Sequence, residues 1–197
     1  MIMNKESGGQ LLTSITSFVN TLLNGKCHPA VTPILFGGNL VALEKKTGDV
    51  RPIAIGYTLR RIAAKCANSF ATAKLKDYFS PIQLGVGVKG GCEAAIHATR
   101  RFLAISQEDT IVAKLDFFNA LNSLHRDTMS KATFEKVPEI YKFFHLAYNS
   151  SSILKYNNLQ ILSQEGPKQG DPLGAFLFCL TIHPILSTLR VHLSSAS

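Results

Sequence analysis

The sequence has few acidic residues, no paired cysteines and no signal for export. Its four cysteines stand apart, with no C-x-x-C pair and no neighbouring histidine cluster, which argues against a zinc knuckle and against a disulfide framework. The first ten residues, MIMNKESGGQ, contain no charged-then-apolar signal sequence. These absences favour a reduced, intracellular protein of the nucleus or the cytoplasm.

The shortage of acids leaves a strongly basic chain. Lysine and arginine number 21 against 13 aspartates and glutamates, so the formal net charge is +8. A surface with this charge attracts polyanions, of which nucleic acid is the commonest. The hydrophobic content of 46% and the charged content of 17% are typical of a globular protein, and 197 residues are enough to bury a core. Nucleic acid is therefore the first candidate partner.

Two stretches look like nucleotide-binding motifs but lack the residues that would complete them. Gly85–Gly91 is rich in glycine, yet the order Gly, four residues, Gly-Lys-Ser/Thr is absent and no strand precedes it, which excludes a nucleoside-triphosphatase loop. His125–Asp127 matches the kinase catalytic triplet, but no other kinase motif accompanies it. The glycine stretch is expected to be a flexible loop that lets the backbone approach a ligand or a strand closely.

Apolar residues at three- and four-residue spacing predict the helices. Gln10–Leu23 is expected to pack one apolar face, which includes Leu11 and Leu12, into a core. In Tyr57–Phe79 the same spacing places Arg60 and four other basic residues in solvent. The inward set predicted for that helix is Leu59, Ile62, Cys66, Phe70 and Ala73. The other predicted helices are Cys92–Ile105, one that opens at His125–Asp127, and one that starts at Pro138 and buries Ile140, Phe143, Phe144 and Ala147.

The pair Asp171 and Pro172 marks the start of a last helix. Asp171 is expected to be a structural cap, with Pro172 in the first turn, where a missing amide hydrogen has little effect. The helix is apolar on most sides, but polar residues and Pro184 interrupt it before the roughly 20 apolar residues that a membrane span needs. We expect a buried core helix and no membrane association.

Turn residues between short apolar runs predict two β-hairpins. The first pairs Asn39–Lys45 with Val50–Ile55, and the second pairs Ser152–Tyr156 with Leu159–Ser163. Pro52 has no amide hydrogen to donate, so its strand is expected at an edge or a bulge. The basic residues Lys45, Lys46 and Arg51 are expected to project from the exposed first hairpin.

The stretch Thr110–Asp127, TIVAKLDFFNALNSLHRD, carries the residue pattern on which the functional prediction depends. Alternating side chains predict a buried strand over Thr110–Asp116. That strand ends in the carboxylate of Asp116, directly before two phenylalanines, where an unpaired charge is costly to bury. A helix cap, a lysine contact and a metal ion are three ways to compensate this charge.

Four stretches, in this order, resemble blocks of the reverse-transcriptase domain of retroelements, particularly of the non-LTR and group II intron type. LEKKTGDVRPIAIG is similar to the fingers hairpin of that family, QLGVGVKGGCEAAIHATR to its next block, AKLDFFNALNSLHRD to its first catalytic block, and EGPKQGDPLGAFLF to its template and nucleotide block. The resemblance implies an α+β fold of the right-hand polymerase type. Residues 1–34 are then an N-terminal helical segment, and residues 35–197 a partial fingers and palm domain.

The resemblance also implies a reaction, the template-directed synthesis of DNA, with an RNA template, a DNA primer and dNTP as partners and no obligate protein partner. Such nucleotidyl transfer uses divalent ions, Mg²⁺ or in its place Mn²⁺, which hard oxygen ligands hold. By resemblance, Asp116 is the first metal-binding carboxylate, and the backbone carbonyl of Phe117 binds the second ion. The other implied contacts are Arg51 and Lys45, with Lys46 as the alternative lysine, to the triphosphate; Gln169 and Leu121 to the nucleotide; and Gly170, Gly85 and Lys89 to the template and primer.

Three departures from the family pattern limit this expectation. Leu121 stands where the family usually has an aromatic ring that blocks ribonucleotides, and Phe118 where related elements often have a lysine. The family's second catalytic block, an aromatic residue followed by two aspartates, and its thumb are not found before Ser197, and the sequence contains no Asp-Asp pair. We expect residues 1–197 alone not to polymerise. Whether the chain is an enzyme stays open, beside two alternatives: a catalytically dead relict or basic RNA-binding module, and a viral-type RNA-dependent RNA polymerase palm.

Overall fold

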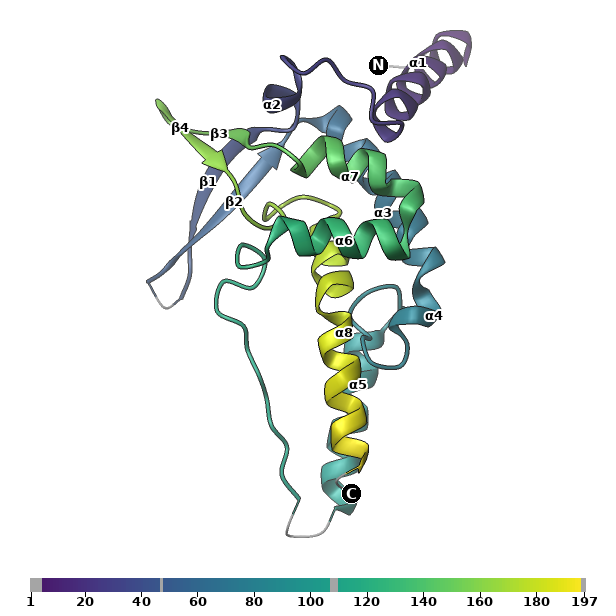
Figure 1. Cartoon of the computed structure of the whole chain (residues 1–197), viewed down its shortest axis with the longest axis vertical. Helices are drawn as coiled ribbons and strands as arrows, with labels where there is room; N and C mark the ends of the chain where they lie inside the picture. The colour runs from purple at the N-terminus through teal and green to yellow at the C-terminus, as the bar shows by residue number, and fades with distance from the viewer. Residues whose placement is uncertain (1–4, 47, 107–109, 196–197) are drawn as a thin grey trace.

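The computed structural model of the chain describes residues 5–46, 48–106 and 110–195. These residues form a mixed α+β fold in which a small sheet lies at one side of a group of helices (Figure 1). The α+β class predicted from the sequence is therefore confirmed. In chain order the elements are α1 (Lys5–Leu23), α2 (Thr32–Leu35), β1 (Gly38–Glu44), β2 (Val50–Gly56), α3 (Thr58–Lys74), α4 (Lys76–Phe79), α5 (Gly91–Ile105), α6 (Arg126–Lys136), the 3-10 helix η1 (Pro138–Ile140), α7 (Tyr141–Tyr148), β3 (Ser152–Tyr156), β4 (Leu159–Ser163) and α8 (Gly174–Ser195).

The sheet consists of two antiparallel hairpins in the order β2-β1-β3-β4. Both predicted hairpins are confirmed, and the turn of the second contains Asn157 with a positive φ of 52°. Only two residue pairs, Gly38 with Leu154 and Asn39 with Lys155, join β1 to β3 in parallel. Pro52 lies on β2, at the edge of the sheet as predicted. Because the hairpins pair only near Gly38, their free ends can splay apart.

Aromatic and aliphatic side chains from α1, α3, α4, α6, α7 and the first turns of α8 form one core. The four residues predicted to be buried in the helical region after Pro138 are at most 4% exposed, which confirms that face. Within this core, Phe79 packs edge-on against Phe176, with ring centroids 5.7 Å apart. This contact joins α4 to the first turns of α8.

The buried face of α3 differs from the prediction. Leu59 and Phe70, predicted to point inward, are 40% and 48% exposed, whereas Arg60, predicted in solvent, is 1% exposed. The helix instead buries a stripe of small residues and contacts α1. Small side chains allow two helices to approach closely, and this close packing outweighs the burial of the larger apolar residues on the other face. The stripe consists of Ala63, Ala64, Ala67 and Ala71.

The predicted buried strand over Thr110–Asp116 is wrong. This segment is irregular in the structure, and Ile111 and Leu115 are 90% and 77% exposed. In Figure 1 it runs as an extended stretch set apart from the helices until it reaches α6. A strand is buried only when neighbouring strands satisfy its amides, and among the described strands none pairs with this segment.

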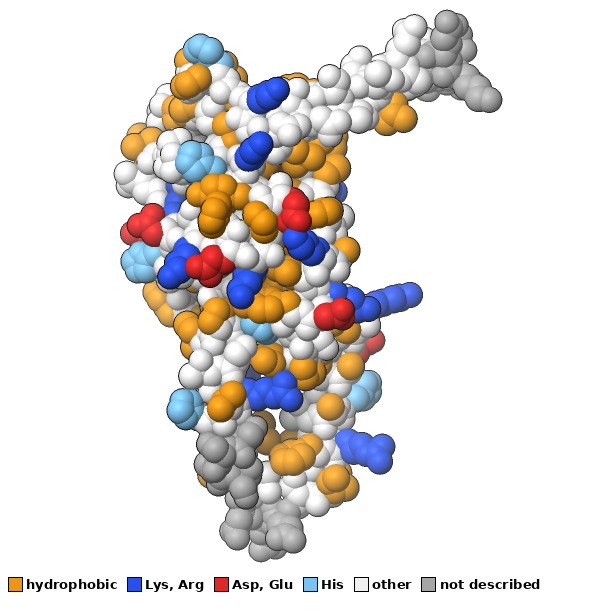
Figure 2. All heavy atoms as spheres, turned by 45° about the vertical axis from the view of Figure 1, so that its right-hand side comes forward, with side chains coloured by type: hydrophobic (Ala, Val, Ile, Leu, Met, Phe, Trp, Pro, Cys, Tyr) orange, Lys and Arg blue, Asp and Glu red, His pale blue; other side chains and the backbone are white. Residues whose placement is uncertain are grey.

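Two long helices are buried over only part of their length. The prediction of a core helix after Asp171 holds for the first half of α8, but Ile185 and Val191 farther along are 70% and 68% exposed. In α1, Leu11 and Leu12 are exposed rather than packed, so that part of the predicted face is also wrong. Figure 2 shows hydrophobic side chains at the surface along much of one face of the molecule.

The length and composition of α8 would also suit a membrane span. The window Gly174–His192 has a mean hydropathy of 1.5, and 28% of it is buried within the protein. The core helix of a globular protein can have the same composition. The expectation that the chain does not associate with membranes therefore stays a prediction.

Candidate functional site

Asp116, Phe117 and Lys45 line one cleft, although Lys45 lies far from the other two in the sequence. This hairpin cleft has a volume of about 610 Å³ and lies between the first hairpin and the segment that precedes α6. Asp116 and Lys45 are both exposed to solvent, so a ligand can reach them. Lys45 lies 3.9 Å from the carboxylate of Asp49. The full lining is Lys45, Asp49, Val50, Pro52, Asp116, Phe117, Phe118, Asn119 and Asn122.

A second cleft lies between the two hairpins, next to the first. This sheet cleft has a volume of about 400 Å³ and contains Gln169, another residue predicted to contact the nucleotide. Pro52, Asn119 and Asn122 line both clefts, so the two share a wall. Predicted ligand contacts from three separate blocks of the sequence therefore border adjoining cavities. The rest of the sheet-cleft lining is Leu40, Ala54, Leu154, Ile161, Leu162, Ser163, Gln164, Glu165 and Lys168.

Backbone contacts with β2 hold Gln169 and Gly170 beside the first hairpin. The amide of Ala54 donates a hydrogen bond of 2.7 Å to the carbonyl oxygen of Gln169. Gly170 has a φ of +99°, and a Cβ there would come within 2.7 Å of the carbonyl oxygen of Ala54. Only glycine tolerates both the left-handed backbone and this close approach. The close approach expected at Gly170 is made to strand β2 in this structure.

A buried ion pair holds the loop after Gln169 in place. Arg60 Nη1 donates a 2.6 Å hydrogen bond to Asp171 Oδ2, which also accepts one of 2.7 Å from the hydroxyl of Tyr148. Asp171 Oδ1 accepts from the amide of Leu173 at 3.0 Å, so Asp171 has the structural role predicted, although α8 begins at Gly174 and Pro172 therefore precedes the helix rather than lying in its first turn. Burial alone would raise the pKa of Asp171, but the charge of Arg60 and these hydrogen bonds outweigh it and lower that pKa.

The sequence pattern did not predict that Arg60 and Tyr148 bind the carboxylate of Asp171. A Cβ at Gly56 would lie 2.2 Å from Arg60 Nη2, so the glycine leaves room for the guanidinium. One signal was present: Arg60 precedes Ala63, Ala64, Ala67 and Ala71 at helical spacing, on the same face as the small residues.

Lys168 ties the same loop to the start of the first hairpin. Its Nζ donates a 2.7 Å hydrogen bond to the carbonyl oxygen of Phe36 and lies 5.1 Å from the ring centroid of Tyr148. The side chain is buried, and burial, followed by the charge of Arg60, lowers the pKa of Lys168 to about 7. Lys168 also lines the sheet cleft, as does its neighbour in the sequence, Gln169.

Several predicted site residues do not line either cleft. Val50 and Pro52 face the hairpin cleft, so Arg51 between them points to the other face of β2. Of the two candidate lysines, Lys45 borders the cleft and Lys46 does not. Leu121 is half-buried in the turn before α6. Gly85 and Lys89 lie in the loop before α5 and line neither cleft.

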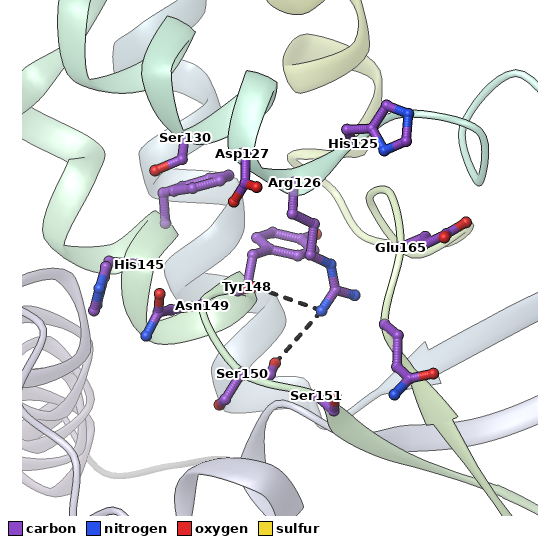
Figure 3. Close-up of a pocket in the computed structure, with 12 residues that line it drawn as sticks. His125, Arg126, Asp127, Ser130, His145, Tyr148, Asn149, Ser150, Ser151 and Glu165 are labelled. Carbon is purple, nitrogen blue, oxygen red and sulfur yellow. Dashed lines mark hydrogen bonds between the residues drawn. The ribbon is translucent and has the colours of Figure 1, made fainter.

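A third cavity, of about 300 Å³, lies between α6, α7 and the base of the second hairpin (Figure 3). Its one lining arginine, Arg126, donates hydrogen bonds to the carbonyl oxygens of Tyr148 and Ser150, as the dashed lines mark, and also to Gly166 and the hydroxyl of Ser163. The guanidinium of Arg126 therefore donates its hydrogen bonds to oxygen atoms of the protein itself. Across the described residues, no group of three or more His, Cys, Asp or Glu side chains could hold a metal ion.

The described residues form a mixed α+β fold with two adjoining clefts, one lined by Lys45 and Asp116 and the other by Gln164 and Gln169. No protein-family model matches the chain. Over 187 residues the chain is 28% identical to the Retrotransposable element SLACS 132 kDa protein of Trypanosoma brucei gambiense. The match covers 91% of this chain and 15% of that protein, so the chain spans a small part of its relative's length. This distant similarity relates the chain to a retroelement protein.

Proposed function

We propose that the chain is part of a retroelement reverse transcriptase and carries one side of its nucleotide site. The observation that carries this proposal is the meeting of Lys45, Asp116 and Phe117 at one cleft, with Gln169 in the adjoining one. The resemblance implies metal contacts for Asp116 and the carbonyl of Phe117, a triphosphate contact for Lys45 and a nucleotide contact for Gln169. Their proximity supports that assignment, and the distant similarity to a retroelement protein agrees with it.

The residues of the hairpin cleft fit a divalent ion and a triphosphate. Asp116 offers an exposed carboxylate and Phe117 a neighbouring carbonyl oxygen, which are the hard ligands that Mg²⁺ or Mn²⁺ takes in proteins. A bound ion would neutralise charge on the triphosphate. The ammonium of Lys45 would bind phosphate oxygens, and Gln169 would contact the nucleotide from the sheet cleft. The partners in this proposal are an RNA template, a DNA primer and dNTP.

Primer extension on an RNA template with Mg²⁺ or Mn²⁺ tests the proposal. The proteins compared are the chain itself and a chimera in which the palm and thumb of a related enzyme follow it. The chain supplies the first of the family's catalytic carboxylates, and the chimera adds the two of the second catalytic block. We therefore expect no extension by the chain alone and extension by the chimera. Asp116→Ala should reduce extension by the chimera by several orders of magnitude.

The matched control is Asp127→Ala, because Asp127 is an exposed carboxylate that lines the third cavity and neither cleft. Extension by the chimera should survive this change. If the Asp116 variant of the chimera extends the primer as well as the parent chimera, the assignment of Asp116 is wrong. Extension by the unmodified chain that Asp116→Ala removes would mean that another carboxylate completes the site.

A second candidate function is a basic RNA-binding module without catalysis. Asp116 lies on an exposed, irregular segment, which favours this alternative. RNA binding by the chain, together with a chimera that shows no Asp116-dependent extension, would support the module over the polymerase.

A further inference from the structure

The ring of Phe117 contacts α8, although the segment that carries this ring is largely exposed. The ring centroids of Phe117 and Phe178 lie 6.0 Å apart and their planes meet at 76°, the edge-to-face arrangement that aromatic pairs prefer. On either side of Phe117 the chain is in solvent, with Leu115 and Phe118 77% and 94% exposed. Among the described residues, this is the one ring contact between residues 110–118 and a helix. Phe117 therefore ties the irregular segment to α8.

Phe178 lies in the first turns of α8, which the core holds in place. Its neighbours in the helix, Phe176 and Leu180, are each 1% exposed. The helix also follows directly on the loop that the buried pair of Arg60 and Asp171 fixes. The half-buried ring of Phe178 is therefore a fixed surface against which another side chain can pack.

Asp116 comes immediately before Phe117, and the two residues line the hairpin cleft together. Within the described part of the chain, the carboxylate of Asp116 makes no hydrogen bond or ion pair that would hold it. The backbone on its C-terminal side enters the turn before α6, where the amide of Ser123 donates to the carbonyl oxygen of Asn119 at 3.1 Å. The contact of Phe117 with Phe178 adds a second fixed point, on a different helix.

Two fixed points reduce the number of positions that the carboxylate of Asp116 can take. A ligand that is already in place loses less conformational freedom when an ion binds, so the ion binds more tightly. The helix that supplies the second point begins just after the loop that contains Gln169. One element, α8, is thus connected both to the proposed ion ligands and to the proposed nucleotide contact.

We propose that Phe178 is a positioning residue, whose ring holds Phe117 so that Asp116 and the carbonyl oxygen of Phe117 are in place at the hairpin cleft to bind the divalent ion. The inference rests on the proposed function, because it needs the ion at Asp116. An edge-to-face aromatic pair changes an equilibrium constant by about twofold to tenfold. Removal of the ring should therefore weaken ion-dependent nucleotide binding by about this factor.

The test is equilibrium binding of dATP to the 197-residue chain with and without Mn²⁺. Phe178→Ala should lower the affinity measured with Mn²⁺ by about twofold to tenfold and leave the affinity without the ion unchanged. Phe178→Tyr keeps the ring and should restore the parent affinity. The matched control is Phe134→Ala, because Phe134 is exposed, lines neither cleft and packs edge-on against Tyr141, with ring centroids 5.1 Å apart.

A second measurement needs neither ion nor nucleotide. Lys114 is an exposed trypsin site in the same segment. If Phe178 restrains this segment, Phe178→Ala should speed cleavage after Lys114 by about twofold to tenfold, because a released segment fits a protease more often. Phe134→Ala and Phe178→Tyr should cleave at the parent rate. Mass spectrometry of the early digest follows this one site, and circular dichroism shows that each variant is folded.

The outcomes separate the inference from the function on which it rests. If Asp116→Ala removes the gain in dATP affinity that Mn²⁺ gives, but Phe178→Ala behaves like Phe134→Ala, the positioning role is wrong while the ion site stands. Equal losses in Phe178→Ala with and without Mn²⁺ would mean that the ring only stabilises the fold, which also overturns the positioning role. If Mn²⁺ gives no gain, or Asp116→Ala leaves the gain intact, both the inference and the proposed ion site are overturned.

Discussion

Asp171 joins the helical core to the loop that contains Gln169, so its removal should destabilise the protein. Asp171→Ala leaves the guanidinium of Arg60, which is 1% exposed, without its carboxylate. Breaking a buried pair from one side generally lowers the free energy of unfolding by about 3–5 kcal/mol. Urea denaturation followed by circular dichroism measures this change.

The control for Asp171 is an exposed ion pair of the same kind. Glu139 accepts a hydrogen bond from Lys74 at the surface, where solvent screens the interaction. Glu139→Gln should therefore change the denaturation midpoint much less than Asp171→Ala does. Equal shifts for the two variants would show that the Arg60–Asp171 pair has no special structural role.

Lys168 should make the stability of the protein depend on pH above neutrality. In the unfolded chain this lysine keeps its proton up to its ordinary pKa of 10.5, whereas in the folded protein its pKa is about 7. Between these values the unfolded state binds more protons, so the free energy of unfolding rises with pH, by at most about 1.4 kcal/mol per pH unit. Below pH 7 both states are protonated and this contribution is constant.

Chemical denaturation of the parent chain and Lys168→Met at pH 7, 8 and 9 measures the effect. Subtracting the variant from the parent removes the contributions of the other titrating groups. The difference in the free energy of unfolding should increase with pH in favour of the parent. A difference that is flat or falls with pH would show that Lys168 remains protonated in the folded protein.

At the scale of the element, the buried face of α3 can be tested by enlarging one alanine on each side of the helix. Ala67 is 2% exposed and lies in the core, whereas Ala73 is exposed. Ala67→Leu should lower the free energy of unfolding by about 1–3 kcal/mol, because a packed core has no room for three more carbons. Ala73→Leu should change it by about 0.5 kcal/mol or less.

Thermal or urea unfolding of the two leucine variants distinguishes the observed face from the one predicted by apolar periodicity. In the predicted arrangement Ala73 points inward, and the larger loss of stability would fall on Ala73→Leu. The prediction failed because apolar periodicity selects the side of α3 that carries the largest apolar residues. In the structure α3 contacts α1, and the side of α3 that is buried carries alanines instead.

Whether the segment before α6 forms a strand also depends on which elements lie next to it. The alternation from Thr110 to Asp116 predicts a strand, but the described strands pair only within and between the two hairpins. Without a neighbour to hydrogen-bond its amides, the segment stays extended and exposed. The local turn around Asn119, by contrast, needs contacts only within a few residues, and it orders the asparagines at the shared wall of the clefts.

At the scale of the whole molecule, the net charge of +8 should produce weak binding to RNA and to RNA–DNA duplex without sequence preference. Figure 2 shows lysine and arginine side chains spread along one face, some of them beside acidic side chains, rather than gathered in one patch. Affinity should fall as salt rises, because phosphate contacts release counterions. Filter binding over a salt series measures the slope.

Lys46 and Arg51 provide the variant for this measurement, since both are exposed on the first hairpin and line neither cleft. Lys46→Gln with Arg51→Gln should flatten the slope of log affinity against log salt by up to about two if both residues contact phosphates. Affinity that does not depend on salt, or no binding even at low salt, would rule out electrostatic attraction as the basis of RNA binding.

Features that depend on a few neighbouring residues could be predicted from the amino-acid sequence. The two hairpins, the edge position of Pro52, the exposed Lys45 and the structural role of Asp171 were predicted correctly, because turn geometry, a missing amide hydrogen and a side-chain hydrogen bond to a nearby amide act over short distances. Three features follow only from the folded structure: which face of α3 is buried, the pairing of Arg60 with Asp171, and the position of Asn119 and Asn122 in the lining of both clefts. Each of these depends on residues far apart in the chain, whose packing no local spacing specifies.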